Sequence, residues 1–305
     1  MIFTSNDRKK TVTLGLVVVT GIVCAALLVR WIDTMRPAPD PKLIDESLYL
    51  NAKTARRMSL AFNGLAADWY WMRSLQYVGR KIMNYPEDAP LDNLKQLNLT
   101  LLAPLLDTAT TLDPQFLDPY EYAAIVLPAI DVQEAIRITQ KGIDANPNAW
   151  RLYQHLGYIY WQQRNYEAAS EIYGRGAQIP GAPPWMEAMK AKMAADGGSR
   201  TTAREIYTRM YEQSTEDQVK GMAHKRLLQL DSLDQRDALR KILTAYQIRA
   251  GKCPNAWKEI EPVLRAVRIP VDAAGSPLDP TGVPYVLRAG ACEIDLNPKS
   301  EILSK

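Results

Sequence analysis

The stretch that decides the fold is residues 150–183, WRLYQHLGYIYWQQRNYEAASEIYGRGAQIPGAP. Apolar and small residues recur in it at helical spacing on both sides of Arg164 and Asn165, a pair that favours a turn. Gly157 precedes this turn and Ala169 follows it, and residues this small let two helices approach closely. The stretch therefore predicts a pair of helices packed through small residues.

The small-residue pattern continues on both sides of this stretch. Ala135, Ala169 and Ala203 stand 34 residues apart. A fixed period in this range signals stacked helix pairs, each of which buries its apolar face only against its neighbours. One further unit covers residues 116–149, and another begins near Pro184. A plain helical bundle is the alternative that this pattern leaves open.

The motif in residues 150–183 resembles a tetratricopeptide repeat. Its first half reads large-x-x-Leu-Gly-x-x-Tyr and its second Ala-x-x-x-aromatic, followed by a proline, with the matching residues Tyr153, Leu156, Gly157, Tyr160, Ala169 and Tyr173. The two flanking units depart further from the family pattern, with Tyr122, Val126 and Lys190 at positions that usually differ. The resemblance implies an all-α, tetratricopeptide-like array and a role in binding proteins.

In this family the first helix of each pair commonly faces a groove that holds peptides or partner helices. Positions one, four, eight and eleven residues after the start of a unit share one helical face. We therefore expect a partner-binding groove formed by Tyr120, Arg151, Gln154, Tyr158, Trp161, Trp185 and Lys192. At least two of the four aromatic residues in this set should be exposed, since others could pack between repeats.

The composition argues against nucleic-acid binding and offers no enzyme signature. The chain has 305 residues, 47% of them hydrophobic, a net charge of +3 and no long basic run. Nucleic-acid binding rests on clustered Lys and Arg. The two histidines, His155 and His224, lie in no metal-binding pattern, and no nucleophile elbow or dinucleotide fingerprint is present. We expect no enzyme activity, cofactor or metal; a hydrolase with unrecognised carboxylates ranks last.

A membrane anchor is predicted at residues 11–31. The apolar run TVTLGLVVVTGIVCAALLV spans residues 11–29, and about 19 helical residues reach roughly 28 Å, close to the thickness of a bilayer core. Arg8, Lys9 and Lys10 precede it, so residues 1–10 should stay in the cytoplasm and the rest of the chain should be periplasmic. A cleaved signal peptide or lipoprotein fits less well, because Leu27–Val29 continue the run and Val23 precedes Cys24.

The remaining chain divides into a spacer, a helical part, the repeats and a C-terminal module. Residues 32–42 form a proline-rich spacer, and residues 43–112 are helical, with one long helix or two in series over 43–83. An aromatic patch at 60–72 reads as a packed helix contact, with a docking pocket or membrane-surface belt as alternatives. Repeats and capping helices fill 113–250, with helices ending at Leu230 and resuming at Gln235. The module, 251–305, has a helix over 257–267 and a short hairpin.

Two features single out the C-terminal module. Cys253 and Cys292 bracket it, and if the module is exported a disulfide between them would staple a region that has few core residues. Residues 279–285, DPTGVPY, resemble a turn near the C terminus of secretion-system pseudopilins that can help to bind calcium there. The likeness covers seven residues, and we interpret this segment as a turn.

These observations predict a single-pass membrane protein of a bacterial-type inner membrane. Its repeat domain would act as a scaffold that binds protein partners, peptide segments or membrane-complex subunits, on the periplasmic side. The alternative is a constitutive structural subunit of an energy-transducing complex or of pilus or secretion machinery.

Overall fold

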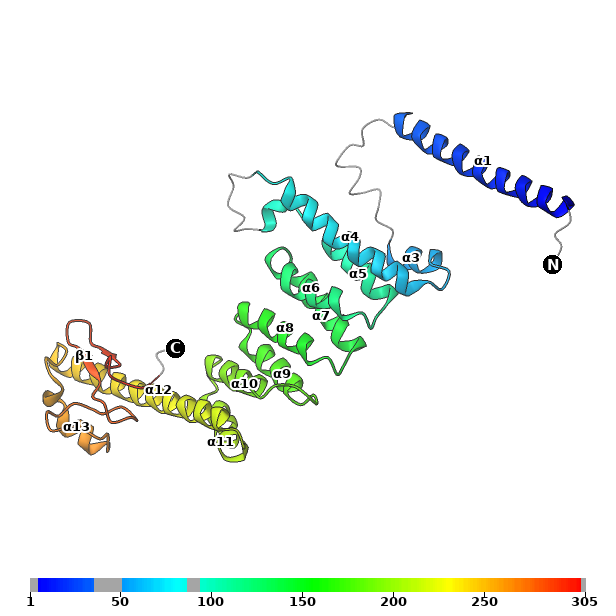
Figure 1. The fold of residues 1–305 in the computed structure, drawn as a ribbon. Helices are drawn as coiled ribbons and strands as arrows, with labels where there is room; N and C mark the ends of the chain where they lie inside the picture. Colours follow the sequence, from blue (N-terminus) through cyan, green and yellow to red (C-terminus); the bar gives the residue numbers. More distant parts are fainter. Residues whose placement is uncertain (1–4, 36–50, 87–93, 303–305) are drawn as a thin grey trace.

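The computed structural model describes residues 5–35, 51–86 and 94–302, and of residues 5–16 and Asp33 it describes only the backbone. The protein is mostly helical with one small sheet (Figure 1). The elements are α1 (Ser5–Met35), α3 (Ala52–Met58), α4 (Asn63–Met83), η1 (Leu94–Leu97), α5 (Leu102–Leu112), α6 (Leu117–Val126), η2 (Leu127–Ala129), α7 (Val132–Ala145), α8 (Trp150–Gln162), α9 (Tyr166–Ala177), α10 (Trp185–Asp196), α11 (Arg200–Gln213), α12 (Asp217–Ala250), η3 (Trp257–Glu259), α13 (Glu261–Ala266), β1 (Val286–Arg288) and β2 (Glu293–Asp295).

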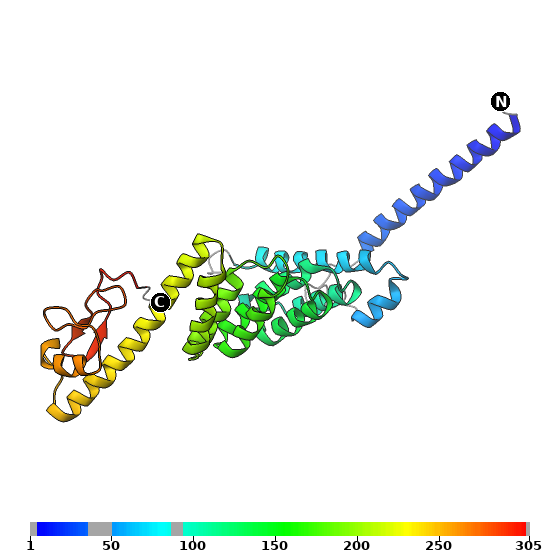
Figure 2. The ribbon, with the colours of Figure 1, turned by 90° about the horizontal axis from the view of Figure 1, so that it is seen from below.

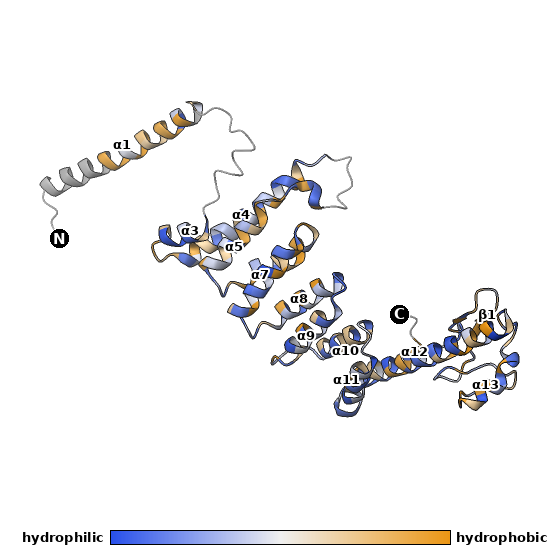
Figure 3. Cartoon of the chain, turned by 180° about the vertical axis from the view of Figure 1, so that it is seen from behind, coloured by the Kyte–Doolittle hydropathy of each residue, from blue (hydrophilic) through white to orange (hydrophobic). Residues whose placement is uncertain are grey.

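Helix α1 contains the predicted membrane anchor. Apolar residues, coloured orange in Figure 3, recur along its described part, and their side chains are exposed. As far as the residues of each helix are described, none is both long enough and apolar enough to span a bilayer. The side chains of residues 11–16 and the prolines of the spacer at 36–42 lie outside the described residues.

From α3 onward the helices pack in chain order along an elongated body (Figures 1 and 2). Helix α4 packs on α5, α6 on α7, α8 on α9 and α10 on α11, and each pair also contacts the next. Ala135, Ala169 and Ala203 are all fully buried in the second helices of the last three pairs. The 34-residue spacing therefore marks equivalent buried positions.

Glycines let the helices come close enough for aromatic rings to fill the space between them. A Cβ atom at Gly157 in α8 would lie 2.8 Å from the ring of Tyr173 in α9, so no larger residue fits without a shift. Gly142 in α7 stands in the same relation to the ring of Tyr120 in α6, also at 2.8 Å. Arg164, at φ 57°, turns the chain between α8 and α9, as predicted.

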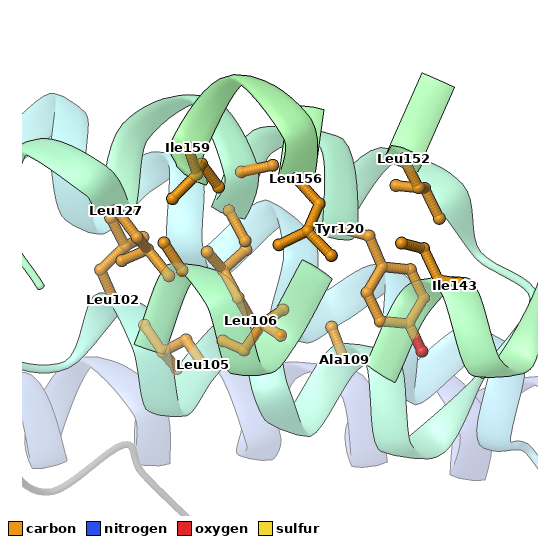
Figure 4. Packing of buried hydrophobic residues seen from close by; sticks show 14 of the residues in the cluster. Leu102, Leu105, Leu106, Ala109, Tyr120, Leu127, Ile143, Leu152, Leu156 and Ile159 are labelled. Atoms are coloured by element: carbon orange, nitrogen blue, oxygen red, sulfur yellow. The ribbon is translucent and has the colours of Figure 1, made fainter. Parts of the chain in front are cut away.

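The core of the N-terminal pairs is continuous from one helix pair to the next. Figure 4 shows leucines of α5 meeting residues of α6, α7 and α8 in one cluster. Tyr120 lies at its centre among Ile143, Leu152 and Leu156. Its hydroxyl donates to the carbonyl oxygen of Thr110 at 3.3 Å, which satisfies the one polar atom of this buried side chain.

The aromatic patch at 60–72 is divided between the inside and the outside of the array. Ala67 and Tyr70 are buried, and the Trp71 ring packs edge-to-face on Tyr122 at 5.3 Å, as expected for a packed helix contact. Leu60 and Trp69 are exposed. The segment over 51–83 forms two helices, α3 and α4, while residues 43–50 lie outside the described residues.

The break expected between Leu230 and Gln235 is absent, because α12 is one continuous helix. No glycine or proline interrupts this stretch, and ion pairs with α11 fix the acidic residues that suggested a turn. Arg204 bonds both Asp231 and Asp234, at 2.9 and 2.7 Å. The first half of α12 packs into the core of α10 and α11, and its second half packs into the C-terminal module.

The C-terminal module packs on the second half of α12. Its strands β1 and β2 pair antiparallel with Leu287 opposite Ile294, one residue later at each strand than the sequence suggested. The helix expected over 257–267 is shorter and divided into η3 and α13 at Ile260, directly before Pro262. The predicted Cys253–Cys292 disulfide is confirmed, with the Cα atoms 5.6 Å apart.

The segment 279–285 is a turn that attaches the module to α12. The Asp279 carboxylate is buried and accepts hydrogen bonds from the backbone of Thr281 and Val283 and from Ser300. The Tyr285 hydroxyl hydrogen-bonds Ser232 at 2.9 Å, and its carbonyl accepts from the Trp257 indole at 3.0 Å. Both ends of the motif are therefore used within the fold.

We expect Gly157→Ala to lower the free energy of unfolding by about 1–3 kcal/mol, because the added methyl group overpacks the Tyr173 ring. Gly221→Ala is the matched control, since Gly221 is exposed in α12 and nothing lies within 4 Å of an added Cβ. It should be neutral or stabilising by up to about 1 kcal/mol. Urea unfolding followed by circular dichroism compares the two; equal effects would contradict the close contact.

The denatured, unreduced protein should carry one reactive thiol, that of Cys24, and three after reduction. Replacing both Cys253 and Cys292 by Ser should destabilise the module by about 4 kcal/mol, the loop-closure entropy expected for a loop of this length. Thiol titration and limited proteolysis measure the two effects. Three reactive thiols without reductant would rule out the bridge.

Candidate partner-binding face

The predicted groove residues of α8 share one side of that helix. Arg151 and Tyr158 are exposed, and Gln154 and Trp161 are half-buried. Trp185 and Lys192 extend this side onto the next first helix, α10. Tyr158 is 49% exposed and Trp185 41%, so the expectation of two exposed aromatic residues is met. We call the side defined by these six residues the α8–α10 face.

Cations and aromatic rings hold one another in place on the α8–α10 face. The rings of Tyr158 and Trp161 meet edge-to-face at 5.7 Å, and the Lys192 ammonium lies 5.1 Å from the Trp161 ring centroid. Lys192 also pairs with Asp196 at 2.5 Å. Such contacts between a cation and a ring are worth about 0.5–1 kcal/mol at exposed sites. They fix the side-chain positions of a surface that is still open to solvent.

A second pair of rings joins the two helices at the other end of the face. Trp150 at the start of α8 meets Trp185 at the start of α10 edge-to-face, with centroids 6.2 Å apart. The Arg151 guanidinium lies 5.5 Å from the Trp150 ring centroid. Trp150 is half-buried, and sequence reasoning missed it because it precedes the positions counted from the start of the unit.

The assignment of Tyr120 to the groove is wrong. Tyr120 is fully buried, and burial raises the pKa of its hydroxyl to about 12. The counting assumed that α6 and α8 stand 34 residues apart, as α7 and α9 do. The 3₁₀ turn η2 follows α6, whereas α8 is joined to α9 by three residues, so the first helices are offset by 33. Tyr120 is then equivalent to Tyr153, which is also buried.

The corrected register extends the α8–α10 face onto α6 with different residues. Asp118 corresponds to Arg151, Glu121 to Gln154 and Ile125 to Tyr158 by the 33-residue offset. Asp118 is exposed, Glu121 half-buried, and Ile125 64% exposed. The exposure pattern of α6 therefore matches that of α8.

The charge on this side changes sign along the array. Carboxylates of Asp118 and Glu121 lie on α6, and the cations of Arg151 and Lys192 lie on α8 and α10. His155 adjoins these residues on α8. Burial lowers its pKa, Glu121 opposes this shift and Arg151 adds to it, so the net pKa is below the ordinary value. His155 is thus neutral at pH 7, and the exposed apolar side chains are flanked by fixed charges of both signs.

A hollow elsewhere, between η1, α5 and α7, is lined by three carboxylates, those of Asp107, Asp131 and Glu134. Asp131 accepts from backbone N–H groups at the start of α7, and Glu134 pairs with Arg137 at 2.7 Å. Burial raises the pKa of Asp107, but hydrogen bonds and charges from Lys141 and Arg137 outweigh it, so the net pKa is lowered. Each carboxylate is engaged in holding helices together.

Within the described parts of the chain, no group of three or more His, Cys, Asp or Glu side chains is placed to hold a metal ion. Comparison with models of protein families and with curated proteins finds no match to this chain.

Two tyrosines test the corrected register. Tyr120→Ala should lower the free energy of unfolding by about 3–5 kcal/mol, since it leaves a cavity in the core. Tyr158→Ala should cost less than about 1 kcal/mol, because its ring is half exposed and fills no core space. Chemical denaturation of both variants measures the difference. Similar losses for the two would contradict the assignment of Tyr158 to the surface and of Tyr120 to the core.

Proposed function

We propose that this protein is a membrane-anchored scaffold whose tetratricopeptide-like helix pairs bind protein partners on the periplasmic side of the membrane. The observation that carries this function is the α8–α10 face. Two large aromatic side chains stay exposed there on consecutive first helices, while the residues beside them are buried. Aromatic residues give large contact areas at low entropic cost and are typical of binding hot spots.

The repeat character of the helix pairs is supported by equivalent residues in successive pairs. Ala135, Ala169 and Ala203 are buried at a 34-residue period, and glycines face aromatic rings in both the α6–α7 and α8–α9 pairs. Such pairs stack through nearest-neighbour contacts and leave an extended surface free on one side. That architecture suits the display of an elongated binding face.

The position beyond the membrane is supported by the disulfide and by the N-terminal sequence. Disulfides persist in oxidising compartments and are rare in the cytosol, so the Cys253–Cys292 bridge favours an exported module. The basic cluster Arg8–Lys10 stands before the apolar run of α1 and favours a cytoplasmic N terminus. Together they place the scaffold between an anchor and an oxidised C-terminal module.

The chemistry of the face favours a peptide segment or helix with apolar side chains and charges of both signs. Tyr158, Trp185 and Ile125 offer apolar contact area. Acidic side chains on α6 and basic ones on α8 and α10 would fix the direction in which a partner lies, because opposite orientations would bring like charges together.

Replacing Tyr158 and Trp161 by Ala should weaken partner binding by about thirtyfold or more, the loss of about 2 kcal/mol expected of a hot spot. The control is Tyr211→Ala, which removes a 45% exposed tyrosine from α11, outside the face. Tagged full-length protein purified in mild detergent, with the captured proteins quantified by mass spectrometry, measures the effect. Circular dichroism checks that both variants keep their helices.

The outcome separates the scaffold from its alternative. Partners that are lost from the double variant but kept by Tyr211→Ala support the face as the docking site. Stoichiometric membrane subunits retained by both variants would instead make the protein a constitutive component of a complex. Equal loss of helicity in the double variant would refute the assignment of the face.

A further inference from the structure

A second apolar surface lies at the N-terminal end of the array and is separate from the α8–α10 face. We define it as the outer stripe, formed by Leu60, Phe62, Leu65, Trp69 and Met72. Their exposed fractions run from 48% for Trp69 to 80% for Leu60. The last three are spaced by four and three residues, so they share one face of α4.

Helix α4 is apolar on two faces, and only one of them has a partner in the fold. Ala67, Tyr70 and Tyr77 are buried against the neighbouring helix α5. The outer stripe lies on the remaining face. A surface helix that is only supported by its neighbours has one apolar face, so a second one calls for a further apolar environment.

The loop before α4 holds apolar side chains outward in an unusual backbone conformation. Leu60 and Ala61 have φ values of 47° and 75°, in the left-handed region that non-glycine residues rarely adopt. The Phe62 N–H donates to the Ser59 carbonyl oxygen at 2.8 Å, which closes the loop. The fold thus maintains a strained turn that presents Leu60 and Phe62 to the outside, where they serve no core.

Basic residues surround the outer stripe. Residues 51–83 contain six Lys and Arg but only one acidic residue, Asp68, although the whole chain is almost balanced at +3. Arg56 and Arg57 are exposed at the end of α3 and form no ion pair among the described residues. On α4 the Arg73 guanidinium lies 5.9 Å from the Trp69 ring centroid. The charges therefore border the apolar side chains directly.

We propose that the outer stripe lies in the headgroup region of a bilayer that contains anionic lipids. Apolar residues and a tryptophan on one helix face, bordered by Lys and Arg, are the features of helices that lie in a membrane interface. Anionic lipids attract such basic residues and supply both an apolar layer and negative charge along the whole stripe. The proposal rests on the membrane location in the proposed function, but not on its partner-binding face.

Lipid explains these features better than a protein partner does. Protein interfaces are depleted in Lys at their core and need acidic groups placed against individual cations. Here the cations come from two helices and a loop, and the apolar side chains project from a convex helix surface rather than from a groove. A continuous anionic surface meets both conditions without matching individual positions.

The test uses the full-length protein in lipid nanodiscs with an environment-sensitive NBD fluorophore on single cysteines. One reporter is Phe62→Cys and a second is Leu65→Cys, both with Cys24→Ala; the bridged Cys253 and Cys292 do not react. Gln213→Cys, exposed at the end of α11, is the control. Native Cys24, labelled in the otherwise unchanged chain, reports on α1. Spin-labelled lipids quench only fluorophores that enter the bilayer.

With phosphatidylglycerol in the discs, lipid should quench the reporters at positions 62 and 65 but not the one at 213. Arg56→Gln with Arg57→Gln should lower the ratio of bound to free stripe about fivefold for each cation removed, from about 1 kcal/mol per residue near an anionic surface. Raising the salt concentration should act in the same direction.

Three outcomes would count against the proposal or its premise. Unquenched reporters at 62 and 65, with Cys24 quenched, would overturn the proposal and leave the anchor intact. Reporters shielded from aqueous iodide but not quenched by lipid would show that protein covers the stripe, which also overturns it. Failure of the Cys24 reporter to be quenched would remove the membrane location itself.

Discussion

The structure depends on how closely paired helices can approach. Gly157 faces the Tyr173 ring, and Gly142 faces the Tyr120 ring, at distances that leave no space for a methyl group. Because each large ring is accommodated by a residue without a side chain, its hydroxyl end and its edges are all used inside the array. The pairs then have no apolar surface to spare on their packed sides, and what remains exposed on α8 and α10 is not required for packing.

The close approach also explains which parts of the fold were predictable. The buried alanines of α7, α9 and α11 recur at 34 residues because the tight contact tolerates little else at that position. The first helices obey the same contacts but not the same count, since η2 lengthens the connection from α6 to α7 by a residue. A period measured on second helices therefore placed Tyr120 on the wrong side. Tertiary contacts, not local spacing, set that register.

Other departures from the sequence predictions have the same origin. Asp231 and Asp234 suggested an interruption of the helix, yet their carboxylates bind Arg204 on α11 and leave α12 continuous. Around α4, apolar residues occur on nearly every side, and periodicity cannot decide which side a neighbour will cover. The structure buries Tyr70 and leaves Trp69 outside. The disulfide was predictable, because its two cysteines bracket the module and pair irrespective of register.

The order of these surfaces along the array constrains how they could act together. The outer stripe lies in the first helices, the α8–α10 face in the middle, and the disulfide-bridged module at the far end of α12 (Figure 2). Helix α12 enters two separate cores, one with α11 and one with the module. Since a continuous helix bends only slightly, the module cannot turn independently of the last helix pair without breaking one of those cores. If the first helices lie on a membrane, α12 therefore holds the module at a fixed distance from it, with the partner-binding face between the two.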